Sequence, residues 1–352
     1  MILNFKKEKL LKIALILTAV LAVFILYFYT LGNKIIVQNE DVYYEDEVSD
    51  REVVGSEDDD SPKSGILGTS CKNAEKRAYA VMMAADRVAR PLSGVSEADL
   101  VFEMPVITDG ITRYMAIFQC EEPKEIGSIR SARHDFINLA LGLDAIYAHW
   151  GGSEFALNKL REGIIDNIDA LVNPHDAYYR KSTARAPHNG FTSFERLDEA
   201  ASKLGYRLTT KFSGYPHTKD ESVRNRDYEI NIPYPSPYNV KFRYDSESNS
   251  YLRSTGGFKE VDKNNNRQVK VKNLVVMKAV SKQIKDQYND VDLENSGELT
   301  VYRNGEIILG SWEKRSDRYY FLNNNKEEIE FTPGKIWVSI IQPNQDIFIK
   351  NL

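Results

Sequence analysis

The chain has 352 residues, of which 42% are hydrophobic and 28% are charged, and its formal net charge is −5. This length accommodates two domains of ordinary size, and the composition excludes a chain that is disordered throughout. The main body contains no dense run of lysine and arginine, so we expect no nucleic-acid partner, because contacts to phosphates require a clustered basic surface.

The first recognisable element is an uncharged apolar run over residues 13–33. About 20 apolar residues cross a hydrocarbon layer of roughly 30 Å, so the run predicts a single helix through the bacterial plasma membrane. Residues 1–12 contain four lysines and one glutamate, which predicts a cytoplasmic tip and an extracytoplasmic main body. A cleaved signal peptide is the alternative, but its apolar region is usually about 7–15 residues and ends in small residues.

Residues 34–70 are rich in acidic side chains and poor in large apolar ones. Such a composition predicts a solvated tether that holds a folded domain away from the membrane. The two cysteines, Cys71 and Cys120, both lie on the exported side of the predicted helix. An oxidising compartment permits a disulfide between them, and the even count is consistent with one.

Residues 71–212 predict a mixed α/β domain. Apolar stretches over 78–83, 99–104, 113–119 and 144–149 are typical of buried strands, and an Asp-Gly turn between the second and third predicts a hairpin. Three helices are expected to begin after Ser131, Ser153 and Thr192, whose hydroxyl groups can cap a helix N-terminus. Residues 173–185 show no periodicity and predict a long loop.

Prolines, glycines and charged residues accumulate over 213–237 and predict a linker. Residues 238–352 then predict a smaller β-rich domain, either a small barrel or an open sheet, because short apolar stretches alternate with asparagine and glycine turns. The expected fold class is therefore α+β, with the α/β domain first. The expected strands of the second domain cover residues 240–244, 269–276, 299–302, 306–309 and 336–341.

The densest group of polar residues lies between residues 127 and 153. Arg130 and Arg133 are three residues apart at an expected helix start, where free N–H groups and guanidinium groups together favour an anion. A carboxylate, a phosphate or a charged envelope glycan would fit. The alternative is that Arg133 and Asp135 form ion pairs that only stabilise the fold. The candidate ligand-binding residues are Arg113, Arg130, Ser131, Arg133, Asp135, His149, His188 and Asn189.

His149 ends a predicted strand just before a glycine turn, and His188 lies in a predicted loop. Functional groups often occur at strand ends and in the loops that follow them. Either is a candidate general acid–base, and the alternative is a hydrogen-bonded structural histidine. Neither has the spacing of zinc ligands, so we expect no metal site and no cofactor. Ser153 lacks the second glycine of the hydrolase nucleophile elbow, and its capping role explains it without chemistry.

Seven stretches of the sequence, taken in order, carry a resemblance to a known family. They are Ala89–Glu103, Gly110–Arg113, Ile126–Arg133 (IGSIRSAR), Tyr147–Ser153 (YAHWGGS), Ala186–Asn189 (APHN), Gly310–Trp312 and Pro333–Trp337. From about Tyr79 onward the chain resembles the YerB-like family of bacterial lipoproteins, whose function is unknown. The resemblance implies a membrane-tethered, outward-facing protein with two linked domains, and it supplies no catalytic residues. This chain departs from a lipoprotein because no cysteine lies in or just after its apolar run.

Three functions remain open on these grounds. The first is an envelope protein that binds an anionic ligand through Arg113, Arg130 and Arg133. The second is an envelope hydrolase or transferase in which His149 or His188 acts as the base. The third is a scaffold that contacts an envelope protein through exposed Trp312 and Trp337, although tryptophans of this kind are more often core residues.

Overall fold

The structure is a computed structural model that describes residues 62–107, 110–222, 227–285, 288–316 and 318–352. The predicted cytoplasmic tip, the membrane-spanning segment and the tether up to residue 61 lie outside these residues. Within the described part of the chain, no helix has the length and apolar character needed to span a membrane.

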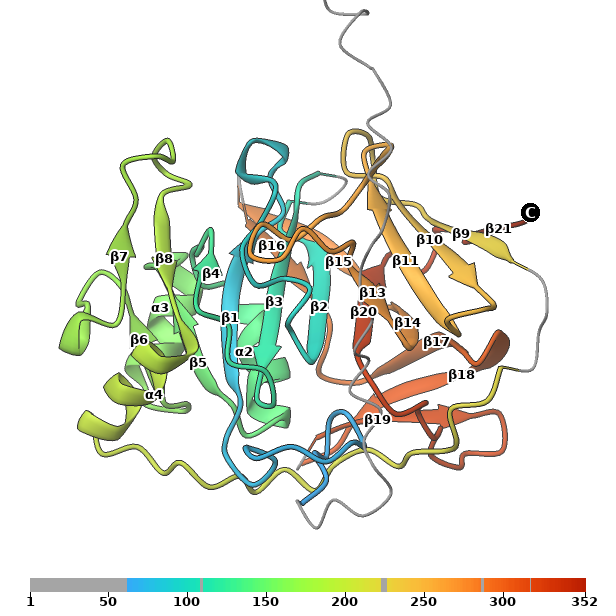
Figure 1. Cartoon of the computed structure of the whole chain (residues 1–352), viewed down its shortest axis with the longest axis horizontal. Coiled ribbons are helices and arrows are strands. Elements are labelled where there is room, and N and C mark those ends of the chain that lie inside the picture. Colours follow the sequence, from blue (N-terminus) through green and yellow to red (C-terminus); the bar gives the residue numbers. More distant parts are fainter. Residues whose placement is uncertain (1–61, 108–109, 223–226, 286–287, 317) are drawn as a thin grey trace, which may run out of the picture. The chain divides into compact units, whose positions relative to one another are not determined.

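A ten-stranded sheet forms the centre of the fold, in the order β19-β18-β17-β14-β20-β2-β3-β1-β5-β6. The two halves of the sequence meet in it, because β20 pairs in parallel with β2 (Figure 1). The C-terminal part of the chain therefore completes a sheet that the N-terminal part begins. The strands are β1 (Tyr79–Ala84), β2 (Leu100–Pro105), β3 (Thr112–Phe118), β5 (Ile146–His149), β6 (Asn167–Asp169), β14 (Asn273–Lys278), β17 (Ser296–Arg303), β18 (Glu306–Lys314), β19 (Tyr319–Asn323) and β20 (Ile336–Ile341).

The inner strands are buried on both faces, which explains their continuous apolar sequences. Every residue of β1, β3 and β20 is buried. The strands expected at 78–83, 99–104, 113–119, 144–149 and 336–341 are confirmed to within two residues at each end. The predicted hairpin is confirmed as well, since β2 and β3 pair antiparallel.

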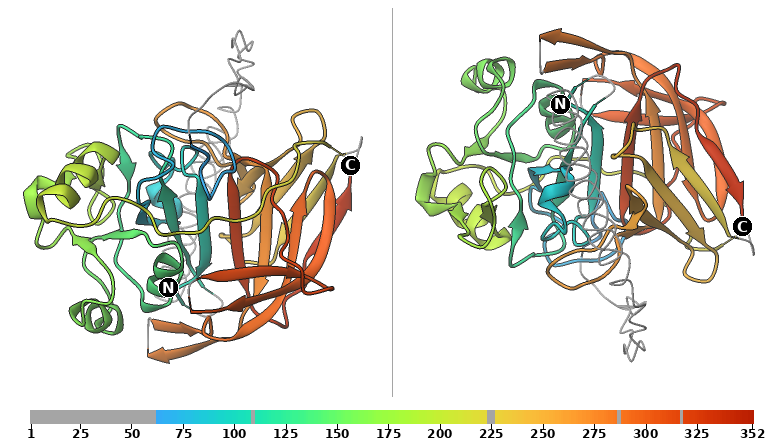
Figure 2. Two further views of the ribbon diagram at one scale, coloured as in Figure 1. Left: turned by 90° about the horizontal axis from the view of Figure 1, so that it is seen from below. Right: turned by 90° about the horizontal axis from the view of Figure 1, so that it is seen from above.

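The two faces of this sheet have different covers. Helices α2 (His134–Gly142) and α3 (Glu154–Arg161) bury apolar side chains, among them Phe136 and Leu160, on one face. Helix α4 (Phe194–Lys203) and a second sheet cover the opposite face. In the two views of Figure 2 the yellow-green helix α4 and the yellow strands of the second sheet lie toward opposite ends of the central sheet.

The second sheet has the order β12-β11-β10-β9-β21, with β13 paired to β11. Every strand pair within it is antiparallel, as expected of an open sheet in a β-rich segment. Its strands are β9 (Tyr228–Ile232), β10 (Val240–Asp245), β11 (Ser250–Thr255), β12 (Phe258–Lys259), β13 (Lys270–Val271) and β21 (Phe348–Asn351). Smaller elements are β4 (Ile126–Gly127), β7 (Tyr179–Arg180), β8 (Gly190–Thr192), the β15 (Ser281–Lys285) and β16 (Tyr288–Val291) hairpin, and 3₁₀ helices η1 (Arg87–Ala89) and η2 (Pro174–Asp176).

The predicted helix caps are confirmed at one position and wrong at two. The Ser153 hydroxyl accepts a hydrogen bond from the Ala156 N–H at 3.1 Å and caps α3. Helix α2 instead has Arg133 at its N-cap, because Ala132 is held in an extended bridge to Gly152. Helix α4 is capped by Ser193 and not by Thr192. The Thr192 hydroxyl of the predicted capping box donates to the Ala177 carbonyl instead.

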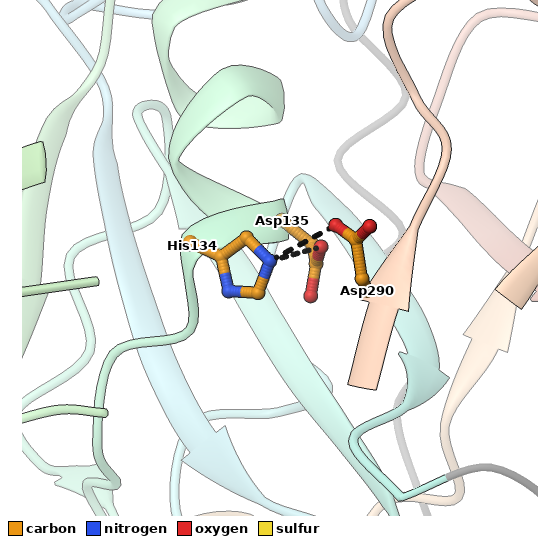
Figure 3. Close-up of side chains that lie close together, drawn as sticks. All are labelled: His134, Asp135 and Asp290. Atoms are coloured by element: carbon orange, nitrogen blue, oxygen red, sulfur yellow. Dashed lines mark hydrogen bonds and ion pairs between the residues drawn. The ribbon is translucent and has the colours of Figure 1, made fainter. Parts of the chain in front are cut away.

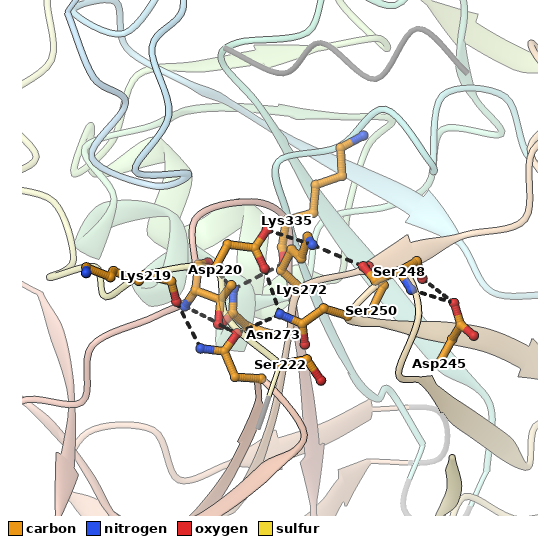
Figure 4. Close-up of polar contacts among 12 residues, drawn as sticks. Lys219, Asp220, Ser222, Asp245, Ser248, Ser250, Lys272, Asn273 and Lys335 are labelled. Carbon is orange, nitrogen blue, oxygen red and sulfur yellow. Dashed lines mark hydrogen bonds and ion pairs between the residues drawn. The ribbon is translucent and has the colours of Figure 1, made fainter. Parts of the chain in front are cut away.

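The described residues of the segment predicted as a linker are built into the fold. The segment contains β9, which pairs with β10 on one side and β21 on the other. Earlier in the segment, Asp220 forms an ion pair of 2.8 Å with Lys272, which also donates to the Ser248 carbonyl (Figure 4). The alternating Tyr-Glu-Ile-Asn-Ile pattern of β9 is typical of a strand, but several prolines follow it directly. Because prolines favour turns, the segment as a whole resembles a linker.

A buried charged cluster ties the second sheet to the first. Arg253 of β11 is 0% exposed and contacts Glu103 of β2 at 2.7 Å as well as Glu260. Its guanidinium group lies 4.2 Å from the centre of the Trp337 ring, and the Trp337 indole N–H donates to Glu103. Trp337 and Trp312 are 0% and 1% exposed, so neither can contact a partner, and the favoured expectation that they are core residues is confirmed. Both tryptophans are core residues.

A disulfide closes the start of the described chain onto the central sheet. Cys71 bonds to Cys120, two residues after β3, and the bond spans 49 positions of sequence. The predicted pairing is confirmed. The segment before β1 is thereby fixed beside the end of β3.

Candidate functional site

Arg130 and Arg133 are positioned by a short extended segment at the edge of the central sheet. Strands β1 and β5 are parallel, and residues 129–132 lie between their carboxyl ends. The Arg130 N–H donates to the Met82 carbonyl, and the Arg130 carbonyl accepts from the Trp150 N–H. Ligand sites in sheets of this kind occur at the carboxyl ends of parallel strands, and this segment lies at such an edge.

Arg113 reaches the same edge from the neighbouring strand. It is the second residue of β3 and pairs with Ala84 at the end of β1, because the two strands run antiparallel. Its side chain is directed to the face that carries α2 and α3, since its neighbour Tyr114 belongs to the core of the opposite face. The Arg113 guanidinium donates to the Ser131 carbonyl at 3.2 Å.

The three arginines are close enough to repel one another. Arg113 is only 7% exposed, and burial together with the charges of Arg133 and Arg130 lowers its pKa to about 9. Burial also lowers the pKa of Arg133, with a further contribution from Arg130. We call Arg113, Arg130 and Arg133 the arginine cluster.

The arginine cluster has few acidic partners. Arg130 forms an ion pair of 3.1 Å with Asp86, which follows β1. Within the described residues, no carboxylate oxygen lies within 4 Å of the guanidinium nitrogens of Arg113 or Arg133. The Arg133 guanidinium lies over the Tyr288 ring at 5.4 Å instead. All three Nε atoms are buried and have no hydrogen-bond partner in this part of the chain. The cluster is therefore an underneutralised cationic site, which favours an anion.

His188 joins the arginine cluster. Burial is the main reason that its pKa is lowered, and the positive charges of Arg130 and Arg113 add to this effect. The preceding carbonyl, that of Pro187, accepts a hydrogen bond from Arg130 at 3.4 Å. The Asn189 side chain is directed to Arg180, whose guanidinium donates to it at 2.8 Å. His188 therefore lies near the arginine cluster, whereas the Asn189 side chain is hydrogen-bonded to Arg180.

His149 lies on the same face of the sheet but is 0% exposed. One ring nitrogen is 2.8 Å from the Gly151 carbonyl, and the other is 3.2 Å from the Asn167 side-chain oxygen. Both ring nitrogens therefore face protein oxygen atoms, and an Asp169 carboxylate oxygen lies 3.8 Å from Nδ1. This geometry is that of a structural histidine, and a role as acid or base stays a prediction.

Asp135 belongs to a second polar group, with His134 and Asp290 (Figure 3). The His134 Nε2 atom lies 3.2 Å from an oxygen of each aspartate. Asp135 also accepts a hydrogen bond of 3.0 Å from the Val291 N–H, and burial raises its pKa to about 6. One imidazole and two carboxylates are suitable ligands for a divalent metal, but the His134 Nε2 atom is already shared between the two carboxylates. Sequence alone gives no signal for this group, because Asp290 lies 156 positions from His134.

Comparison with known proteins agrees with this fold. Two family models match the chain, the N-terminal domain of a protein of unknown function (DUF3048) over residues 64–207 and the corresponding C-terminal domain over residues 230–338. A Bacillus subtilis protein named "Putative lipoprotein YerB" is 32% identical over 288 residues, which covers 80% of this chain and 86% of that protein.

The crystal structure of the YerB protein from Bacillus subtilis superimposes with a TM-score of 0.75 at 30% identity. It covers 82% of this chain and 100% of the chain in that crystal. The resemblance to the YerB-like proteins seen in the sequence is therefore confirmed across both halves of the described chain. The chain belongs to the DUF3048 family, together with YerB.

Proposed function

We propose that this protein is a membrane-anchored protein of the bacterial cell envelope that binds an anionic ligand through its arginine cluster. The name of the Bacillus subtilis relative supports attachment to the membrane. The lysine-flanked apolar run at 13–33 supports an anchor with the folded part outside. The Cys71–Cys120 disulfide supports an oxidising compartment, because such bonds persist outside the cytoplasm.

One observation carries the binding proposal. Three guanidinium groups converge at one sheet edge, and only Arg130 has a carboxylate within ion-pairing distance among the described residues. Keeping unpaired cations close together and buried is costly, and a bound anion would remove that cost. Arginine is also the residue best suited to hold carboxylate or phosphate through paired hydrogen bonds.

The burial of the arginine side chains limits the size of the group that can bind to them. The Arg130 side chain is 16% exposed and Arg113 is 7% exposed, so the cluster is reached by a small group and not by a broad surface. A single carboxylate or phosphate group, free or projecting from an envelope glycan, matches this access.

Isothermal titration calorimetry tests the proposal with full-length protein in neutral detergent. Inorganic phosphate, acetate and glucuronate are the titrants, which separate a phosphate ligand from a carboxylate and from an acidic sugar. We expect saturable binding of at least one of them, and a loss of at least tenfold in Arg130→Met and Arg133→Met. Arg161→Met, an exposed arginine of α3, is the control and should bind as wild type. Equal binding in all variants, or none in wild type, would overturn the proposal.

A further inference from the structure

A separate pocket of about 370 Å³ lies on the other face of the central sheet. It is formed where the segment after β1 meets the β11–β12 hairpin of the second sheet. Arg113 and Tyr114 are adjacent on β3 and face opposite sides, and the Tyr114 hydroxyl contacts Glu260, which lines this pocket. The pocket is thus distinct from the arginine cluster.

Apolar side chains form most of its wall. Phe258 is 67% exposed, although it is a large aromatic residue. Pro91, Leu92, Pro237 and Val261 complete the apolar part. An exposed phenylalanine inside a concave apolar wall is typical of a ligand site, and the volume is at the lower end of those that bind small molecules.

Positive charge surrounds this wall. Arg87 and Lys259 are exposed and, among the described residues, have no carboxylate within 4 Å. Arg90 donates to the Ala85 carbonyl at 2.8 Å, which fixes its guanidinium beside the pocket. Among the described residues that line the pocket, Glu260 is the only acidic one, and its carboxylate is already paired with Arg253. The pocket therefore has uncompensated positive charge.

A buried polar group also faces the pocket. Thr255 is 4% exposed, and its hydroxyl has no hydrogen-bond partner in the described part of the chain. A buried hydroxyl without a partner is costly, so a ligand atom that can hydrogen-bond to it would be favoured. This observation is independent of the charges at the rim.

We propose that this pocket binds a small amphipathic anion, with an apolar body against Phe258 and an acidic head beside Arg87 and Lys259. The proposal does not depend on the arginine cluster, which lies on the other face of the sheet. The apolar contacts would supply the affinity, and the cations would select an acid over an amine or an alcohol of the same shape.

Fluorine NMR of fluorophenylbutyrate tests this with the full-length chain in neutral detergent, and detergent alone is the blank. We expect saturable line broadening that unlabelled phenylbutyrate reverses and phenylbutylamine does not. Phe258→Ser should weaken binding at least tenfold. Phe348→Ser, which removes a phenylalanine of equal exposure from β21, should leave it unchanged.

Charge is tested separately with the double variant Arg87→Gln/Lys259→Gln. It should bind the acid at least fivefold more weakly and lose the preference over phenylbutylamine. Arg113→Met should bind the probe as wild type does, which separates this pocket from the arginine cluster. Absence of saturable binding to wild type, equal binding in Phe258→Ser, or displacement by amine and acid alike would overturn the proposal.

Discussion

Replacement of Arg113 by methionine should make the unliganded protein more stable. Arg113 is 7% exposed, has two arginines as neighbours, and has no carboxylate of the described chain within 4 Å. A pKa lowered to about 9 corresponds to about 5 kcal/mol against charging of this group in the folded state. The variant also loses a charged hydrogen bond to the Ser131 carbonyl, which contributes about 2 kcal/mol. The expected net gain is about 3 kcal/mol.

Urea unfolding of the full-length chain, followed by tryptophan fluorescence, measures this gain. Arg161→Met is the matched control, because Arg161 is exposed, and its stability should change by less than about 0.5 kcal/mol. An anion at a concentration a hundredfold above its Kd should raise the free energy of unfolding of wild type by about 2.7 kcal/mol and leave that of Arg113→Met unchanged. An Arg113→Met variant that is less stable than wild type without anion would refute the reasoning, because Arg113 would then be compensated within the fold.

Three further outcomes follow from other parts of the structure. Arg253→Met should lower the free energy of unfolding by about 3–5 kcal/mol, because it leaves two buried carboxylates without their cation. The control Arg315→Met, at the surface, should lower it by less than about 1 kcal/mol. Similar losses in the two variants would contradict a special role of the buried arginine. Cys71→Ser/Cys120→Ser should lose about 4 kcal/mol in urea, because the bond closes a loop of 49 positions, and an unchanged midpoint would argue against that constraint. The folded-state pKa of Asp135 is raised to about 6, so ionisation of this carboxyl group destabilises the fold. As pH falls from 7 to 4, the free energy of unfolding of wild type should rise by up to about 3 kcal/mol relative to that of Asp135→Asn. A constant difference between the two proteins across this pH range would exclude the role of Asp135.

The central strands could be predicted because burial on both faces imposes uninterrupted apolar sequences. Strand β20 was predicted at its observed bounds for this reason. Strand β9 was missed, since its alternating pattern lies beside the prolines of residues 233–237. The pairing of β20 with β2 could not be predicted at all, because register between segments more than 200 residues apart has no local signal.

The residue pattern drew attention to Arg130 and Arg133 for a reason that the backbone does not bear out. Arg130 and Arg133 are three residues apart and were expected to share one face of a helix start, but the chain is extended here and α2 begins only at His134, so their proximity does not follow from that spacing. Arg113 joins them because β3 runs antiparallel to β1. The expected cap at Ser131 was wrong, since tertiary pairing of Ala132 with Gly152 delays the helix start.

The buried groups of the site could not be read from sequence. His149 has the same flanking residues whether its ring faces solvent or the core, and the structure gives both ring nitrogens protein partners. The second polar group depends on β16 reaching the start of α2, so the proximity of Asp290 to His134 is a tertiary feature. Burial and long-range contacts are thus what the residue pattern leaves out.

Anomalous diffraction from crystals of this protein soaked in selenate tests the central claim most directly. Selenate carries the charge and the oxygen geometry of a phosphate or sulfate group, and its selenium marks the bound position. The account predicts an anomalous peak among the guanidinium groups of Arg113, Arg130 and Arg133, and no such peak in Arg113→Met crystals. A wild-type map with selenate bound elsewhere and none within the arginine cluster would contradict it.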